Sequence, residues 1–115
     1  MPSSAHRLTK RGDIEKVLRR GKTVHGDYLT IKVAQNNREA LRFTVVVSLK
    51  VSKKAIERNK VRRRVREIMR TEITPSVTKP ADVAILLKKS SLDASYEELK
   101  KTLVKAFQKT RLLES

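Results

Sequence analysis

The sequence predicts an α+β fold in the order helix, two or three strands, helix, strand, helix. Segments whose apolar residues recur at every second position alternate with segments whose apolar residues recur every three to four positions. A chain of 115 residues is long enough for one modest two-layer core and too short for two. Its hydrophobic content of 38% is enough to fold beside 35% charged residues. We therefore expect one domain over residues 1–115, with residues 1–7 as a candidate disordered tail.

The N-terminal third predicts a helix and then a strand. A short helix is expected near Lys10–Arg20, and Gly21 suits its end. Three apolar residues share one face of this helix: Ile14, Val17 and Leu18. Tyr28–Ala34 alternates with a period of two, which predicts a strand. Its apolar face carries Leu29, Ile31 and Val33, and its other face carries Tyr28, Thr30 and Lys32.

A second alternating segment, Leu41–Leu49, predicts a longer strand. Its core face carries Leu41, Phe43, Val45, Val47 and Leu49. The opposite face carries Arg42, Thr44, Val46, Ser48 and Lys50, and a face of this kind tolerates water. The segment Asn36-Asn37-Arg38-Glu39 suits a hairpin loop before this strand, and a short strand is expected around Thr23–His25.

The C-terminal half predicts a helix, a strand and a second helix. The first helix runs from Lys54 or Ala55 to about Thr71, with a narrow apolar stripe formed by Val61, Val65, Ile68 and Met69. Pro75 and Pro80 bound a loop, and the continuous apolar run in Ala81–Leu87 is typical of a central strand. Ser95 and Glu98 have the spacing of a capping box for the last helix. That helix is expected to bury Leu99, Leu103, Ala106 and Phe107.

The positive charge is concentrated in one short segment. The net charge is +16, and a field of that size on a small body attracts polyanions. Residues 50–70 contain ten Lys/Arg and two Asp/Glu, which gives +8, whereas residues 71–115 contain eight and six. Half of the net charge therefore lies in 21 residues, which indicates a localised contact surface.

The predicted basic helix leaves most of its circumference free for a partner. Between residues 58 and 70 there are six Arg and one Lys, and guanidinium groups bind phosphate in a bidentate fashion and stack on bases. Neighbouring like charges at helical spacing repel one another, and an anionic partner removes that cost. A merely solvated basic face is the alternative, which the charge density and the arginine bias disfavour. Composition alone leaves DNA and RNA open.

The sequence offers no catalytic constellation and no metal site. The chain has no Cys, only two His and only three Gly, so a thiolate site and a glycine-rich phosphate loop are excluded. Its scattered acids are expected to be caps or surface partners: Asp13, Glu15, Asp27 and Asp82. No apolar run is long enough to cross a bilayer, and residues 1–7 lack the apolar core of a signal peptide. We therefore expect a cytoplasmic protein without a membrane partner.

The basic segment resembles the signature of the bacterial ribonuclease P protein subunit. The matching residues are Arg58-Asn59-Lys60-Val61-Arg62-Arg63-Arg64-Val65-Arg66-Glu67, and Val47-Ser48-Leu49-Lys50 fits the lead-in. The segments Leu8-Thr9-Lys10-Arg11, Gly21-Lys22 and Asp82-Val83 also fit, as does the closing helix from Ser95. The resemblance covers almost the whole chain in order, and its central motif is long and specific.

The resemblance implies a fold and a role. The fold would be a two-layer α/β sandwich with a four-stranded sheet, in the order α-β-β-β-α-β-α, with a left-handed βαβ crossover similar to the second domain of a small-subunit ribosomal protein. A large RNA would hydrolyse one phosphodiester of precursor tRNA and release the 5′ leader, using Mg²⁺ bound mainly by the RNA. The protein would hold no cofactor. It would be mostly monomeric, in a 1:1 complex with the catalytic RNA, and would also bind the leader.

The resemblance also implies site residues. Those that would contact the catalytic RNA are Lys53, Lys54, Arg58, Asn59, Lys60, Arg62, Arg63, Arg64, Arg66 and Arg70. Those that would line a leader-binding cleft between the first helix and the open sheet face are Ile14, Leu18, Tyr28, Thr30, Lys32, Ser48 and Lys50. Many relatives carry aromatic residues where this chain has Ile14, Leu18 and Lys32, so we expect leader binding to rest more on charge and to be more sensitive to salt.

Two departures and three alternatives accompany this interpretation. The segment Val51-Ser52-Lys53-Lys54 is one residue longer than the common loop and lacks its Gly. A ribosomal-type structural RNA-binding protein would share the size and charge but would not need the open polar sheet face. A nucleoid-type DNA-binding protein would use the basic helix in a major groove, but the sequence shows no dimer feature. An intrinsic nuclease is disfavoured because no cluster of acids is present.

Overall fold

The computed structural model describes residues 6–36, 38 and 40–113, and within them one four-stranded mixed sheet. Its strands are β1 (Lys22–His25), β2 (Leu29–Ala34), β3 (Arg42–Val46) and β4 (Asp82–Leu87), in the spatial order β1-β2-β4-β3. β2 is antiparallel to both β1 and β4, whereas β3 is parallel to β4. The α+β class and the predicted element order are confirmed, and the handedness of the crossover stays a prediction.

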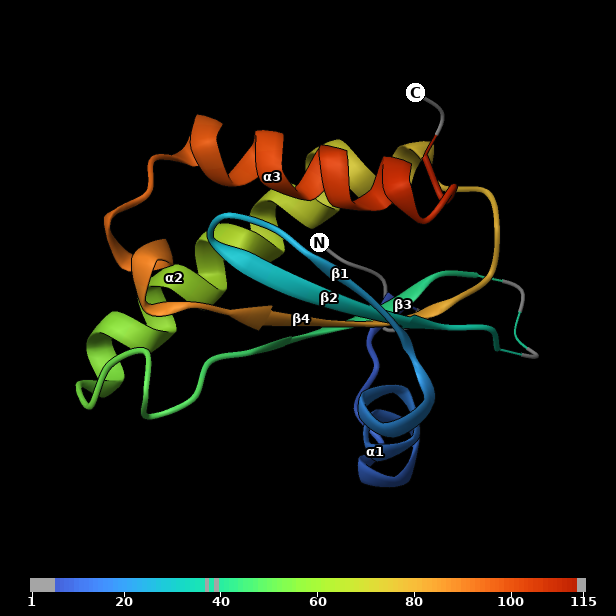
Figure 1. Ribbon diagram of the computed structural model, residues 1–115, viewed down its shortest axis with the longest axis horizontal. Helices are drawn as coiled ribbons and strands as arrows, with labels where there is room; N and C mark the ends of the chain where they lie inside the picture. The colour runs from blue at the N-terminus through green and yellow to red at the C-terminus, as the bar shows by residue number, and fades with distance from the viewer. Residues whose placement is uncertain (1–5, 37, 39, 114–115) are drawn as a thin grey trace.

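Three helices cover the two faces of this sheet unequally. α2 (Ala55–Ile68) and α3 (Tyr96–Lys109) lie on one face, and α1 (Arg11–Arg20) lies on the other (Figure 1). The larger core fills the space between the sheet and the pair α2 and α3. A small cluster of Leu8, Val17 and Ala84 lies beneath α1. Much of the face that carries α1 is therefore left to polar and small side chains.

The alternation of the strand residues produces this division. Val83, Ile85 and Leu87 of β4 point into the larger core, whereas Ala84, between them in sequence, packs beneath α1. β4 lies between β2 and β3 and is buried along almost its whole length. The prediction that the continuous apolar run forms a central strand is confirmed, because a strand covered on both faces needs apolar residues at every position.

α3 forms as predicted. The Ser95 hydroxyl accepts a hydrogen bond from the Glu98 amide at 3.1 Å, and the Glu98 carboxylate accepts one from the Ser95 amide at 2.9 Å, which confirms the capping box. The apolar residues expected to be buried, Leu99, Leu103, Ala106 and Phe107, are all in the larger core. This helix is therefore fixed at its N-terminus and along one face.

The predicted hairpin between β2 and β3 is wrong. β4 lies between those two strands, because its two-sided apolar run needs the central position. Asn37 and Glu39 of the predicted loop lie outside the described residues. The hairpin joins β1 to β2 instead, where the Gly26 amide donates to the Leu29 carbonyl oxygen at 2.8 Å. A Cβ at Gly26 would lie 2.8 Å from the Thr102 side chain, so the close approach of α3 requires glycine.

The end of β3 differs from the prediction. β3 ends at Val46, and a turn follows in which the Val51 amide donates to the Ser48 carbonyl oxygen at 3.0 Å. The turn breaks the alternation, so Leu49 is 67% exposed and Val51 is buried in its place.

The start of the described chain pairs with β3. The Leu8 amide donates to the Phe43 carbonyl oxygen at 3.0 Å, and Arg7 forms a β-bridge with the same residue. Residues 6–8 therefore follow the outer edge of β3, and residues 1–5 lie outside the described residues.

Candidate nucleic-acid interface

α2 contacts the core through one narrow stripe. Val61, Val65 and Ile68 are buried, and Met69 is buried in the π-helical turn Met69–Ile73 that continues the helix. The predicted stripe is therefore confirmed. The remaining side chains of the helix lie on two flanks and on an outer face, and they carry the basic residues of the signature.

The turn that leads into α2 is held by Ser52 and Arg58. The Ser52 hydroxyl accepts a hydrogen bond from the Lys54 amide at 3.1 Å and donates one to Glu57. The Arg58 guanidinium donates to the Ser52 carbonyl oxygen at 3.0 Å. Lys54, at the N-cap, makes no side-chain cap. This turn therefore lacks the glycine of the common loop, and α2 lacks a side-chain hydrogen bond at its N-cap. Hydrogen bonds made by Ser52, Glu57 and Arg58 hold the turn in place.

Several cations of α2 are engaged within the protein. Arg64 donates to the Ala94 carbonyl oxygen at 3.0 Å, which ties one flank of α2 to the segment before α3. Arg62 donates to the Asn59 side chain at 2.8 Å, and Arg70, in the π-helical turn after α2, pairs with Glu67. Bonds of this kind fix the direction of a guanidinium group but leave some of its five donors free. These residues are therefore oriented by the fold.

The outer face of α2 holds cations of a different kind. Lys60, Arg63 and Arg66 are exposed, as are Lys53 and Lys54 at the start of the helix. Among the described residues, none of these five cations forms an ion pair with a carboxylate. An unpaired, exposed guanidinium or ammonium group is available for a phosphate oxygen. The structure therefore places five of the ten predicted residues on a surface open to an anion.

Arg7 joins this basic surface, although the sequence pattern did not single it out. Partial burial lowers the pKa of Arg66, and the nearby positive charges of Arg7 and Arg62 lower it further. Arg7 reaches this flank because residues 6–8 run beside β3. The only sequence signal was the basic character of residues 1–22, which carry seven Lys/Arg and two Asp/Glu. Within the described part of the chain none of these three guanidinium groups forms an ion pair, and neighbouring positive charges of this kind favour an anionic partner.

The face of the sheet beneath α1 gathers four of the seven predicted leader residues. Strand register pairs Lys32 with Ala84 and Thr30 with Leu86, so Thr30 and Lys32 share the face on which Ala84 packs beneath α1. Ile14 and Leu18 pack on the same cluster from α1. The Lys32 ammonium donates to the Leu18 carbonyl oxygen at 2.9 Å and so fixes the C-terminal end of α1.

Tyr28 lies apart from that group, whereas the part of Ser48 and Lys50 in leader binding stays a prediction. The prediction that Tyr28 shares a face with Thr30 and Lys32 is wrong, because β2 begins at Leu29 and the alternation does not extend to residue 28. The Tyr28 hydroxyl donates to the Glu98 carboxylate at 2.6 Å, beside the larger core. This hydrogen bond raises the pKa of Tyr28 and lowers that of Glu98. Ser48 and Lys50 are exposed in the turn beyond β3.

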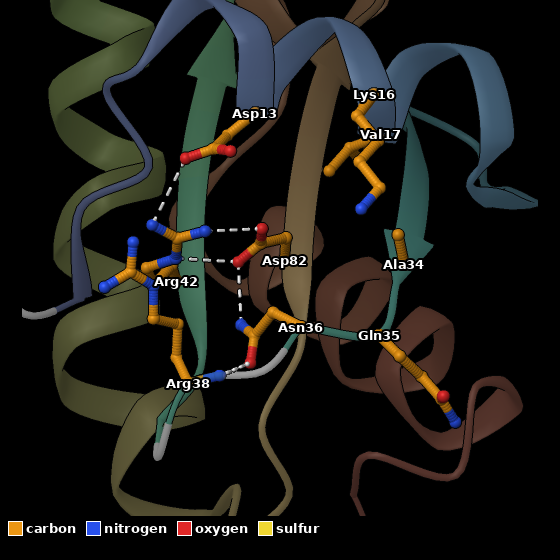
Figure 2. A pocket seen from close by; sticks show the side chains of 9 residues that line it. All are labelled: Asp13, Lys16, Val17, Ala34, Gln35, Asn36, Arg38, Arg42 and Asp82. Carbon is orange, nitrogen blue, oxygen red and sulfur yellow. Dashed lines mark hydrogen bonds and ion pairs between the residues drawn. The ribbon is translucent and has the colours of Figure 1, made fainter.

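A cavity of about 380 Å³ opens on the other flank of α1, at the end of the sheet where β3 and β4 begin (Figure 2). At its base the Asp82 carboxylate accepts hydrogen bonds from Arg42 at 2.8 and 2.7 Å and from Asn36 at 2.7 Å. Asp82 is 6% exposed, so the expectation of a cap or surface partner is wrong for this residue. The buried Arg42–Asp82 pair raises the pKa of Arg42 and ties β3 to β4.

The described residues contain no group of three or more His, Cys, Asp or Glu side chains that could hold a metal ion. No described helix is long and apolar enough to span a membrane. The residues described above offer anion-binding cations on α2 and hydrogen-bonding groups beneath α1.

The chain matches the family model described as Ribonuclease P over residues 2–111. A ribonuclease P protein component from Microcystis aeruginosa is 35% identical over 109 residues, which cover 88% of this chain and 90% of that protein. The corresponding protein of Bacillus velezensis is also 35% identical, over 93% of this chain and 90% of its own length. The similarity therefore spans nearly the full length on both sides.

Solved structures show the same arrangement of elements. The RNase P protein from Thermotoga maritima superposes with a TM-score of 0.79 at 25% identity, over 90% of this chain and 96% of that one. The RNase P protein of Staphylococcus aureus gives a TM-score of 0.82 at 18% identity, over 95% of this chain and 98% of that one, which shows the fold alone. The four-stranded mixed sheet with three helices is thus shared with these proteins.

Proposed function

Because the chain belongs to the ribonuclease P protein family, we propose that it binds the catalytic RNA through α2 and the 5′ leader of precursor tRNA through the sheet face beneath α1. It is the protein component of the ribonucleoprotein endonuclease that processes tRNA. The observation that carries the proposal is the division of α2 into a narrow buried stripe and a broad basic surface. We further propose a 1:1 complex with the RNA in the cytoplasm.

The proposed contact with the catalytic RNA has two kinds of residue. Lys60, Arg63 and Arg66 are exposed and unpaired among the described residues, so they are assigned to phosphate groups. Arg58 and Arg64 donate to backbone carbonyl oxygens of the protein, so they are assigned mainly to positioning α2. This assignment refines the expectation that all the signature cations contact RNA in the same way.

The proposed contact with the leader depends on charge and on small side chains. Thr30 and Lys32 on β2 and the apolar edges of Ile14 and Leu18 on α1 lie on this face. Each aromatic stacking contact on a base is worth about 1–3 kcal/mol, and this group offers none. The leader contribution is therefore expected to fall steeply with salt.

The protein residues act by binding and orientation, and Mg²⁺ is proposed to be bound by the RNA. When bound there, Mg²⁺ would supply the activation of water and the stabilisation of the leaving oxygen. The cations of α2 and Lys32 lower the electrostatic repulsion between the two RNA chains and hold the leader against the protein. The protein is therefore expected to help most when Mg²⁺ is scarce.

Reconstitution tests this proposal. We expect the protein to increase cleavage of precursor tRNA by the catalytic RNA at low Mg²⁺, and to bind a precursor more tightly than mature tRNA once assembled with the RNA. Cleavage no better than that of the RNA alone would contradict the family role in this chain. Equal affinities for precursor tRNA and mature tRNA would instead favour a structural RNA-binding role of the ribosomal type.

A matched pair of variants tests the leader face. Lys32→Gln removes the charge and keeps a side-chain N–H donor on the side that faces the Leu18 carbonyl oxygen, one bond nearer the backbone. Lys22→Gln removes the same charge from β1, outside the proposed contact. We expect Lys32→Gln to weaken binding of precursor tRNA without affecting mature tRNA, and Lys22→Gln to change neither. Equal behaviour of the two variants would remove the face beneath α1 from leader binding.

A further inference from the structure

We propose that the cavity on the second flank of α1 binds one single-stranded ribonucleotide whose base carries an exocyclic amino group, with Asp13 as the group that reads the base. The inference rests on the RNA-binding role proposed above, but it concerns a separate place. Its lining residues on α1 are Asp13, Lys16 and Val17, whereas the leader face uses Ile14 and Leu18. α1 thus separates the cavity from that face.

The floor of the cavity is held together by hydrogen bonds among Arg42, Asp82 and Asn36. Arg42 is only 13% exposed and is held by both oxygens of Asp82, and Asn36 bonds to Asp82 and to the Ala40 carbonyl oxygen. Among the described residues, no buried side-chain polar atom lacks a hydrogen-bond partner. The side chains of this floor are already oriented, so binding of a ligand would cost little reorganisation. The cavity volume of about 380 Å³ is in the range of small-ligand pockets.

Asp13 is the acceptor that this network leaves available. Its contact with Arg42 is long, at 3.5 Å, and its side chain is 34% exposed at the cavity. A carboxylate accepts hydrogen bonds and donates none, so it suits the amino group of a base such as cytosine. Uracil presents a carbonyl oxygen at the same position and would be repelled. The carboxylate therefore provides a physical reason for discrimination.

Two cations at the rim suit the phosphate of the same nucleotide. Lys16 reaches from α1 toward the end of β2 at Ala34, and Arg38 lies beside Arg42 (Figure 2). Both are exposed, and neither forms an ion pair within the described part of the chain. Ala34 and the buried Val17 also line the cavity, between its rim and its floor. A free phosphate would meet Asp13 as well as the cations, so the arrangement suits a nucleotide better than a simple anion.

Titration of the full-length free protein with cytidine and uridine monophosphates, followed by amide NMR signals, tests the inference. We expect cytidine monophosphate to shift signals of residues 13–17 and 34–36, with an affinity about fivefold to tenfold above that of uridine monophosphate. Inorganic phosphate alone should leave these signals nearly unchanged. Equal affinity for the two nucleotides, equal effects of phosphate alone, or shifts confined to α2 would each overturn the inference.

Two variants of α1 complete the test. Asp13→Asn replaces the carboxylate with an amide that both donates and accepts, so the preference for cytidine should disappear. Glu15→Gln makes the same chemical change on the exposed part of α1, where Glu15 pairs with Arg11, and should keep the preference. A preference unchanged in Asp13→Asn would overturn the assignment of Asp13. If neither nucleotide binds but the protein still stimulates cleavage normally, this inference is wrong and the proposed function is unaffected.

Discussion

α2 and α3 are two helices of 14 residues each on the same face of the sheet, and they are built for different tasks. α3 begins with a complete capping box and buries five residues. α2 has no side-chain cap and buries three. The difference indicates that α3 contributes more to stability, whereas α2 leaves most of its side chains exposed.

The placement of charge reinforces this contrast. α3 has Glu97 and Glu98 in its first turn and Lys109 in its last, which agrees with the helix dipole. α2 places Arg62 and Arg66 one turn apart, with Arg7 beside them. Repulsion of this kind raises the free energy of the isolated protein and is relieved by phosphate. Binding and stability are therefore expected to respond to different substitutions.

The largest expected effect on stability comes from the core side of α3. Phe107 is completely buried, and Phe107→Ala should lower the free energy of unfolding by about 3–5 kcal/mol. Urea denaturation monitored by circular dichroism measures this loss. The fraction of the Phe107→Ala protein that remains folded at low temperature should bind the catalytic RNA with near-normal affinity. A loss smaller than about 1 kcal/mol would contradict the assigned role of α3.

The next effect concerns binding through α2. Arg62→Ala together with Arg66→Ala should weaken binding of the catalytic RNA and flatten its salt dependence, with each lost phosphate contact reducing the slope by about 0.7–0.9. The free energy of unfolding should stay the same or rise, because like charges are removed. Titrations at several salt concentrations measure the slope. If it does not change, α2 is not part of the interface.

The caps of the two helices provide a smaller comparison. Ser95→Ala removes the capping box of α3 and should lower the free energy of unfolding by about 0.5–2 kcal/mol. Lys54→Ser supplies the cap that α2 lacks, at a residue whose backbone is already extended, and should raise the free energy of unfolding by up to about 1 kcal/mol. Urea midpoints of the two variants should thus move in opposite directions. A shift in the same direction would show that the two N-termini are not held differently.

The smallest effect concerns Tyr28 and pH. The hydrogen bond from Tyr28 lowers the pKa of Glu98, so its stabilising contribution is complete above the ordinary pKa of glutamate, about 4.3, and is lost as pH falls through the lowered value. Tyr28→Phe should make the free energy of unfolding less dependent on pH in that range and leave leader binding intact. Urea midpoints from pH 3 to pH 6, roughly the window of this titration, measure the first effect. If Tyr28→Phe weakens leader binding, Tyr28 contributes to the leader contact after all.

The sequence predicted features that depend on local periodicity. The capping box at Ser95 and the stripe from Val61 to Met69 are confirmed, because helical spacing determines which side chains share a face. The central position of β4 followed from its continuous apolar run. The general location of the basic surface followed from the charge of residues 50–70.

Features that depend on long-range pairing were not predictable in the same way. Alternation shows which face a residue occupies but not which strand lies beside it, so the β2–β3 hairpin was wrong. The burial of Asp82 depends on Arg42 and Asn36, which are 40 and 46 residues away. Arg7 reaches α2 only because residues 6–8 follow β3. Such contacts leave no periodic signal in the sequence.

The central claim, that α2 binds RNA whereas α3 supports the fold, is tested most directly by two triple variants of equal charge. One combines Lys60→Ala, Arg63→Ala and Arg66→Ala on α2, and the other combines Lys101→Ala, Lys105→Ala and Lys109→Ala on the exposed side of α3. The measurement is the affinity of each for the catalytic RNA against salt concentration. We expect a slope reduced by about two to three for the α2 variant and little change for the α3 variant. Equal losses in the two would show that total charge, and not the surface of α2, governs binding.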